Sequence, residues 1–193
     1  MSKNRNLIRA FVAVDVGDEV RASAASLIRD LAASGADVKW VEPHNLHLTL
    51  KFLGDVDLTE TADVCAAIAK AAEGIAPFNL AIRGAGAFPD IRRPRTVWLG
   101  VADETGRLGE LFKNIENRLQ KLRFRKESRG FHAHLTIGRL RDGRQSVEVL
   151  SELLELSADF DAGPTSVSEV VLYASHLSST GPTYEVLGRA KLE

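Results

Sequence analysis

The chain has 193 residues, a net charge of −1, 45% hydrophobic and 26% charged residues, which is typical of one compact globular unit or two small lobes rather than of a disordered or fibrous protein. The single cysteine, Cys65, excludes a disulfide framework and favours a reducing compartment. No apolar run approaches the roughly 20 residues of a membrane helix, and the N-terminal residues lack the flanks of a signal peptide, so we expect a cytoplasmic protein.

The first half of the chain predicts the order strand, helix, strand, helix, strand. β-branched and aromatic residues indicate the strands, and apolar residues at helical spacing indicate the helices. Thr59 has the position and chemistry of a helix N-cap. The predicted elements are strand 7–15, helix 18–34, strand 45–52, helix 59–73 and strand 78–88.

The strand predicted at 45–52, NLHLTLKF, alternates strictly between apolar and polar side chains. Because successive side chains of a strand point to opposite faces, one set should face the core and the other should face away. We expect Leu46, Leu48, Leu50 and Phe52 in the core, and Asn45, His47, Thr49 and Lys51 on the opposite face.

The second half repeats this order about 87 residues later. Ser146 is the expected N-cap of its second helix. The predicted elements are strand 96–101, helix 108–119, strand 131–138, helix 146–154 and strand 165–174, followed by a last strand at 183–192. We interpret the chain as an internal duplication with halves at about 7–90 and 94–175.

Each half carries the pattern His-apolar-Thr-apolar on its second strand, as His47 with Thr49 and His134 with Thr136. Residues i and i+2 of a strand lie on one face, so each motif presents an imidazole beside a hydroxyl. Two such imidazoles can serve as general base and general acid in phosphodiester hydrolysis, since both forms of histidine are accessible near neutral pH. The hydroxyls can donate to phosphate oxygens.

Two other functions fit part of the sequence. His132 and His134 lie at i and i+2 and could both bind zinc in a metal-dependent phosphoesterase, although the sequence indicates no third ligand. The segments 121–130 (KLRFRKESRG) and 91–95 (IRRPR) are rich in basic residues and could belong to a non-catalytic RNA-binding module. Such clusters are more often solvated surface.

The segments RAFVAVD, HLTLKFLG, VWLGV, HLTIGR and LYASHLSSTGPTYEVL occur in this order over nearly the whole chain. In these segments the sequence resembles the 2H phosphoesterase superfamily, and within it the RNA 2′,3′-cyclic phosphodiesterases, also called 2′-5′ RNA ligases. The resemblance implies an α+β fold of two pseudo-symmetric lobes with antiparallel sheets that line a central cleft. It implies hydrolysis of RNA 2′,3′-cyclic phosphate ends to 2′-phosphates, tRNA halves being one source of such ends, by a monomer without metal or cofactor.

The resemblance also assigns roles within the two motifs. It makes His47 the proton donor to the leaving 3′ oxygen and His134 the proton acceptor from water, a distinction that the repeated motif alone cannot make. Thr49, Thr136 and Arg139 are the implied phosphate ligands, with a surface salt bridge as the alternative for Arg139. Phe11 and Phe52 match positions near the cleft where a base could stack, with core packing as the alternative for both. Ligation would be the reverse of the same chemistry.

Overall fold

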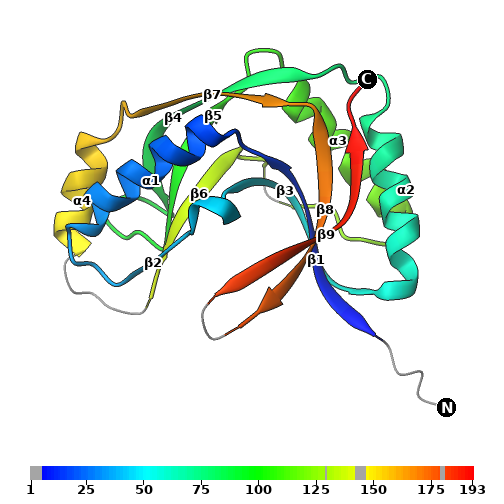
Figure 1. Cartoon of the computed structure of the whole chain (residues 1–193), viewed down its shortest axis with the longest axis horizontal. Helices are drawn as coiled ribbons and strands as arrows, with labels where there is room; N and C mark the ends of the chain where they lie inside the picture. The colour runs from blue at the N-terminus through cyan, green and yellow to red at the C-terminus, as the bar shows by residue number, and fades with distance from the viewer. Residues whose placement is uncertain (1–5, 129, 142–146, 179–180) are drawn as a thin grey trace.

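The computed structural model describes residues 6–128, 130–141, 147–178 and 181–193, whose strands form two antiparallel sheets with helices on their outer sides (Figure 1). In spatial order, the four-stranded sheet contains β3 (His47–Asp57), β1 (Leu7–Asp15), β8 (Glu169–Leu177) and β9 (Pro182–Lys191). The five-stranded sheet contains β2 (Val38–Trp40), β6 (His134–Leu140), β5 (Thr96–Ala102), β4 (Phe78–Phe88) and β7 (Asp161–Val167). The predicted α+β class with two antiparallel sheets is confirmed.

Two helices cover each sheet. In Figure 1 the α2 and α3 helices lie beside the four-stranded sheet, where α2 contacts β8 and β9 and α3 contacts β3, while α1 contacts β7 and α4 contacts β4 on the other sheet. The helices are α1 (Asp18–Ala32), α2 (Thr61–Ala72), α3 (Arg107–Lys121) and α4 (Val147–Leu156), with short 3-10 turns η1 (Pro43–Asn45) and η2 (Leu58–Glu60). Among the described helices, none combines the length and apolar character needed to cross a membrane.

Local chemistry explains where α3 begins. Asp103 Oδ2 accepts hydrogen bonds from the backbone N–H of Leu108 at 2.9 Å and of Gly109 at 3.3 Å, so it satisfies donors that the first turn of a helix leaves unpaired. The apolar positions of the helix are buried, including Leu111, Ile115 and Leu119. The hydrophobic face that the sequence indicated therefore packs into the core.

The two sheets each combine strands from both halves of the chain. β4 closes the first half in sequence, yet it pairs with β5, and β8 near the end of the second half pairs with β1. The order β3-β1-β8-β9 in one sheet consequently matches the order β6-β5-β4-β7 in the other. In both orders the motif strand of a half is followed by the first strand of that half and then by the closing strand of the other half. Each half thus donates its closing strand to the sheet of the other half, an exchange that the order of elements did not reveal.

Some predicted boundaries differ from the structure, and one lies outside the described residues. Thr59 lies inside η2, and α2 begins at Thr61, because Asp57 accepts the backbone N–H of Thr59 at 3.0 Å and caps the 3-10 turn instead. The strand predicted at 165–174 is two strands, β7 and β8, which belong to different sheets. The expected N-cap Ser146 lies outside the described residues.

The alternation predicted for β3 is wrong after Leu50. The pairing with β1 shifts in register between Thr49 and Lys51, so that Leu50 is an extra residue without a cross-strand partner. Such a bulge reverses which side chains point inward. Lys51 is consequently buried, at 7% exposure, whereas Phe52, expected in the core, is 65% exposed.

Candidate functional site

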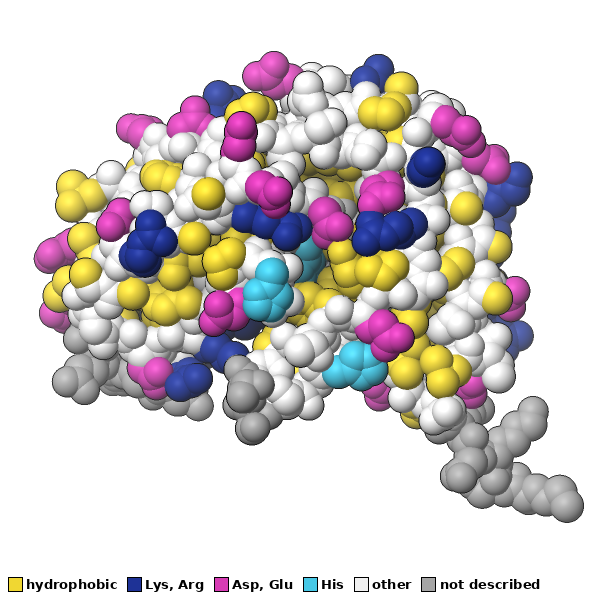
Figure 2. All heavy atoms as spheres, in the orientation of Figure 1, with side chains coloured by type: hydrophobic (Ala, Val, Ile, Leu, Met, Phe, Trp, Pro, Cys, Tyr) yellow, Lys and Arg dark blue, Asp and Glu magenta, His cyan; other side chains and the backbone are white. Residues whose placement is uncertain are grey.

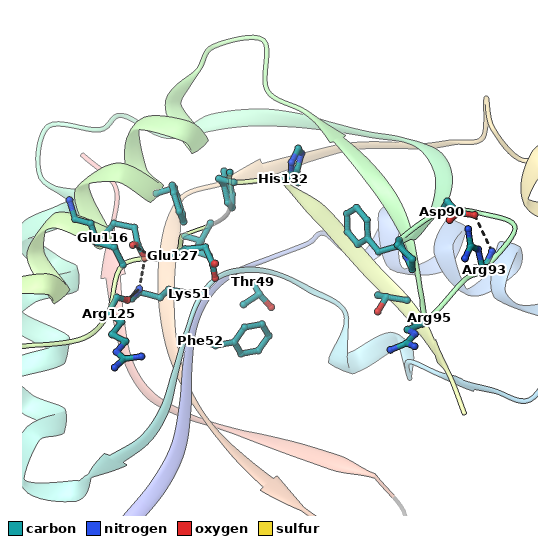
Figure 3. A pocket seen from close by; sticks show the side chains of 18 residues that line it. Thr49, Lys51, Phe52, Asp90, Arg93, Arg95, Glu116, Arg125, Glu127 and His132 are labelled. Atoms are coloured by element: carbon teal, nitrogen blue, oxygen red, sulfur yellow. Dashed lines mark hydrogen bonds and ion pairs between the residues drawn. The ribbon is translucent and has the colours of Figure 1, made fainter. Parts of the chain in front are cut away.

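A cleft of about 1190 Å³ lies between the two sheets, and its walls come from four separate parts of the chain. Figure 2 shows this hollow near the middle of the molecule, with histidine and basic side chains beside it. Figure 3 shows Thr49 and Phe52 of β3 between residues of the β4–β5 connection and residues near α3. Its lining residues include Thr49, Phe52, Phe88, Thr96, Phe131 and His132.

His47 is the first residue of β3, and its ring orientation is fixed by the backbone before the strand. Its Nδ1 lies 2.7 Å from the carbonyl oxygen of Asn45. Because a carbonyl can only accept a hydrogen bond, Nδ1 must carry the proton and donate it. The opposite nitrogen, Nε2, is then left to accept a proton when the ring is neutral and to donate one when it is charged.

His134 repeats this arrangement at the first residue of β6. Its Nδ1 lies 2.7 Å from the carbonyl oxygen of His132, so the same argument places the proton on Nδ1 and leaves Nε2 available. The ring meets Phe88 edge-on with a centroid distance of 5.0 Å. Phe88 and His132 line both the main cleft and the smaller pocket that His134 lines, so this histidine borders the cleft.

The two histidines differ in what surrounds them. His47 packs against Phe11, Tyr173 and Tyr184, at centroid distances of 4.8, 6.4 and 5.2 Å. Its cross-strand partner is Asp15, whereas the cross-strand partner of His134 is Gly100. Only the first motif therefore has a carboxylate at this position.

These surroundings determine the pKa of His47. Burial lowers the pKa below its ordinary value of 6.5, while the hydrogen bond to Asn45 and the negative charge of Asp15 oppose the decrease. Tyr173 donates its hydroxyl hydrogen to Asp15 Oδ1 at 2.7 Å. Burial and this hydrogen bond raise the pKa of Tyr173, so the tyrosine stays protonated and holds the carboxylate.

The two motif threonines lie two residues beyond their histidines, and both are half-buried. Thr49 lines the main cleft, and Thr136 is the cross-strand partner of Trp98 on β5. Within the described ranges neither hydroxyl has a hydrogen-bond partner in the protein. Both hydroxyls are therefore available to a ligand.

Arg139 connects the two sheets electrostatically. It lies exposed on β6, where its Nη1 donates to Thr96 Oγ1 at 3.2 Å. On the other sheet, burial lowers the pKa of His47 and raises the pKa of Tyr184, and the positive charge of Arg139 acts in the lowering direction on both. The strands that carry the two residues, β6 and β3, are in contact. Among the described carboxylates none forms an ion pair with Arg139, which disfavours the salt-bridge alternative.

The two phenylalanines occupy opposite environments. Phe11 is only 3% exposed and stacks with Tyr173 at 5.3 Å, so the structure favours its core-packing alternative, as the residue beneath His47. The Phe52 ring extends into the cleft (Figure 3), where a flat ligand can reach it. Of these two rings, Phe52 is the one that the cleft exposes.

Sequence reasoning missed a buried ion pair beside the cleft. Lys51 Nζ donates to Glu116 Oε1, and the two side chains are 5% and 6% exposed. A signal was present, because Glu116 falls on the apolar stripe of the predicted helix 108–119, four residues after Phe112. A carboxylate at such a position requires a buried partner, and the bulge in β3 supplies Lys51.

The residues of the metal alternative do not form a larger ligand group. His132 lies exposed before β6 and contributes its carbonyl to His134, as described above. In the part of the chain that the structure describes, no three His, Cys, Asp or Glu residues converge as metal ligands. The third ligand that a zinc site needs was not found in the sequence either.

The model of the family described as LigT like Phosphoesterase matches this chain twice, over residues 14–98 and 99–184. A protein of Methanothermobacter thermautotrophicus named RNA 2′,3′-cyclic phosphodiesterase is 39% identical over 178 residues, which span 92% of this chain and 95% of the relative. A Thermotoga maritima protein of the same name is 34% identical over 186 residues, 96% of either chain.

Solved structures agree with these matches. The crystal structure of a Thermus thermophilus protein, TT0787, superposes with a TM-score of 0.79 at 28% identity, over 96% of this chain and 98% of that one. The E. coli LigT structure in complex with 3′-AMP has a TM-score of 0.75 at 28% identity, over 97% and 99% of the two chains.

Proposed function

The chain belongs to the family of LigT-like phosphoesterases, and on this premise we propose that it hydrolyses RNA 2′,3′-cyclic phosphate ends to 2′-phosphates with two histidines and no metal. The observation that carries the proposal is the pair of matched Nδ1 contacts, at 2.7 Å to Asn45 and 2.7 Å to His132, which leave Nε2 of His47 and His134 free for proton transfer.

The reaction balances with one proton moving through each histidine. Neutral His134 takes a proton from water through Nε2 as the water oxygen bonds to phosphorus. The bond from phosphorus to the 3′ oxygen breaks, and protonated His47 gives its Nε2 proton to that oxygen. The hydroxyls of Thr49 and Thr136 and the guanidinium of Arg139 bind the non-bridging oxygens, where negative charge accumulates.

The assignment of His47 as the acid rests on the resemblance, and Asp15 supports it. A carboxylate near an imidazole favours its charged form, and only His47 has one across the strand. Burial works against this role by lowering the pKa of His47 in the free protein. A bound phosphodiester anion adds a second negative charge beside the ring, which raises that pKa when the substrate is present.

The same arrangement would serve 2′-5′ ligation. An RNA 5′-hydroxyl takes the place of water, His134 accepts its proton, and the 3′ oxygen again leaves with a proton from His47. Microscopic reversibility of the in-line reaction permits both directions.

The test uses a short RNA ending in a 2′,3′-cyclic phosphate, in excess EDTA, with wild type, His47→Ala and His134→Ala. We expect a 2′-phosphate product, with each variant slowed by about 10²–10⁴-fold. His176→Ala is the matched control, because this exposed histidine pairs with Glu185 away from the cleft.

Other outcomes would identify the alternatives. A 3′-phosphate product would keep the two-histidine chemistry but reverse the leaving oxygen. Activity that requires added zinc and is lost in His132→Ala would favour the metal-dependent phosphoesterase. RNA binding without turnover, retained in both histidine variants, would favour a binding module.

A further inference from the structure

The carbonyl group that fixes the ring of His47 belongs to a residue that is itself bound to the last strand of the fold. Asn45 ends η1, and its side-chain Nδ2 donates to the carbonyl oxygen of Pro182, the first residue of β9, at 3.1 Å. The two residues are 137 positions apart in the chain. Because Asn45 also offers its own carbonyl to Nδ1 of His47 at 2.7 Å, one residue joins β9 to the proposed acid.

Asn45 is buried, at 9% exposure, although the alternating pattern of 45–52 predicted that it faces away from the core. A buried amide is costly unless it forms hydrogen bonds. Its backbone N–H donates to the carbonyl oxygen of Glu42 at 2.8 Å, in addition to the contacts with Pro182 and His47. The position of the Asn45 carbonyl is therefore set by both the backbone and the side chain of this residue.

The turn that carries Asn45 is too short to hold its own position. η1 spans only Pro43–Asn45, and a single 3-10 turn is not stable by itself. Among the described residues, the bond to Pro182 is the hydrogen bond by which a side chain of η1 reaches another element. α1 also contacts the turn, so loss of this bond should displace the turn rather than unfold the chain.

β9 contacts His47 a second time. Tyr184, two residues after Pro182, meets the imidazole edge-on with a centroid distance of 5.2 Å. β9 is the last strand of the chain and lies at the edge of the four-stranded sheet (Figure 1). The strand that supports His47 thus lies beyond both halves of the proposed duplication.

The second motif has no corresponding side-chain contact. The carbonyl that accepts from His134 belongs to His132, whose side chain is exposed. In the part of the chain that the structure describes, that side chain forms no hydrogen bond. The two motif histidines share the backbone contact, but only for His47 does another strand secure it.

We propose that Asn45 is a positioning residue for the catalytic acid: its side chain, bonded to β9, holds the Asn45 carbonyl in place, so that His47 presents Nε2 to the leaving oxygen. A general acid must lie within hydrogen-bond distance of the atom it protonates, and a displacement of about 1 Å can cost about 10²-fold in rate. Supporting contacts of this kind keep catalytic groups in the productive geometry. This inference rests on the proposed function and adds to it a residue that acts through His47.

The first experiment measures kcat and KM for an RNA with a 2′,3′-cyclic phosphate end. The variants are Asn45→Ala and Asn45→Leu, of which the second keeps the volume of the side chain and removes only its polar atoms. We expect kcat to fall by about 10–100-fold in both. KM should stay within about threefold of wild type, because loss of an interaction that serves the transition state lowers kcat rather than substrate binding.

The matched control is Asn114→Ala. Asn114 Nδ2 donates to the carbonyl oxygen of Ala71 at 3.3 Å, so this variant also removes an amide-to-carbonyl bond between two elements, here α3 and α2. Asn114 lines neither the main cleft nor the pocket beside His47, and its kcat should equal that of wild type. A loss of kcat in Asn114→Ala as large as in the Asn45 variants would indicate general destabilisation and overturn the inference.

The second experiment observes the ring of His47 and does not depend on activity. In alkaline buffer, where the ring is neutral, its ¹⁵N chemical shifts report which nitrogen carries the proton, and that choice depends on the hydrogen bond at Nδ1. Wild type and Asn114→Ala should show only Nδ1–H. Both Asn45 variants should show a substantial fraction of Nε2–H at His47 and none at His134.

The two experiments separate the inference from the proposed function. A His47 ring that remains fully Nδ1–H in both Asn45 variants would refute the positioning role, whether or not the protein hydrolyses the cyclic phosphate. If wild type does not hydrolyse the cyclic phosphate, the proposed function fails. A changed tautomer at His47 would then still show that Asn45 positions this ring.

Discussion

At the scale of single residues, two identical sequence motifs acquire different chemistry from their neighbours. Both histidines donate Nδ1–H to the carbonyl two residues earlier, so the motif itself fixes the tautomer. Their cross-strand partners differ, being Asp15 for His47 and Gly100 for His134. The sequence could identify the two histidines by their repeat, but only the register of the strands reveals which of them has a carboxylate neighbour.

The pKa of His47 should respond in opposite directions to two substitutions. It should lie below 6.5 in wild type because burial dominates. Asp15→Asn removes a charge that raises the pKa, so a further decrease is expected, whereas Arg139→Gln removes a charge that lowers it and should give an increase. NMR titration of the His47 ring proton on Cε1 measures all three values.

Shifts of the same sign in both variants would contradict this account, provided that the remaining backbone resonances are unchanged.

The lowered pKa of His47 also affects the stability of the fold. Because folding lowers this pKa, protonation of His47 opposes folding. The contribution of neutral His47 to stability is therefore complete above pH 6.5, the pKa in the unfolded chain. It is lost as the pH falls through the lowered pKa of the folded protein.

At the scale of elements, β3 shows where pattern reasoning succeeds and where it stops. Alternation placed Leu46, Leu48 and Leu50 in the core correctly. It failed at Lys51 and Phe52, because a bulge depends on pairing with β1 and leaves no mark in a single strand's pattern. The carboxylate of Glu116 on an apolar helix face was the available clue, and it lay 65 residues away from Lys51.

The Lys51–Glu116 pair gives a stability prediction. Lys51→Met leaves the carboxylate of Glu116 buried without its cation, which should lower the free energy of unfolding by roughly 3–5 kcal/mol. The double variant Lys51→Met/Glu116→Leu removes both charges and should recover much of that loss, since well-packed apolar replacements of buried pairs are often neutral. Urea denaturation measures both.

The exposed pair Lys70–Glu73 is the matched control, with side chains 61% and 52% exposed. Lys70→Met should change the free energy of unfolding by less than about 1 kcal/mol. A loss in the double variant as large as in Lys51→Met would mean that the hydrogen bonds of Glu116 to Glu127 and of Lys51 to Arg125, rather than the charges, stabilise this wall of the cleft.

At the scale of the whole molecule, the exchanged strands bring the two motifs into one unit. His47 on β3 and His134 on β6 belong to different sheets, and each sheet contains strands of both halves. The repeat in the sequence led to the proposal of a duplication, with halves at about 7–90 and 94–175. It could not show that the closing strands cross over, because strand order depends on pairing between distant segments.

This exchange predicts that neither half folds alone. A fragment of residues 1–91 contains β1 and β3 but lacks β8 and β9, and its β4 lacks both β5 and β7. Because two-stranded remnants rarely bury enough apolar surface to be stable, we expect each of the fragments 1–91 and 92–193 to unfold without a cooperative transition. Circular dichroism during thermal unfolding measures this.

Mixing the fragments should restore a cooperative transition and hydrolysis of the cyclic phosphate, since the break falls in the exposed connection at Arg92. A cooperative transition in the first fragment by itself would mean that the halves are independent lobes and that the exchange is not needed for folding.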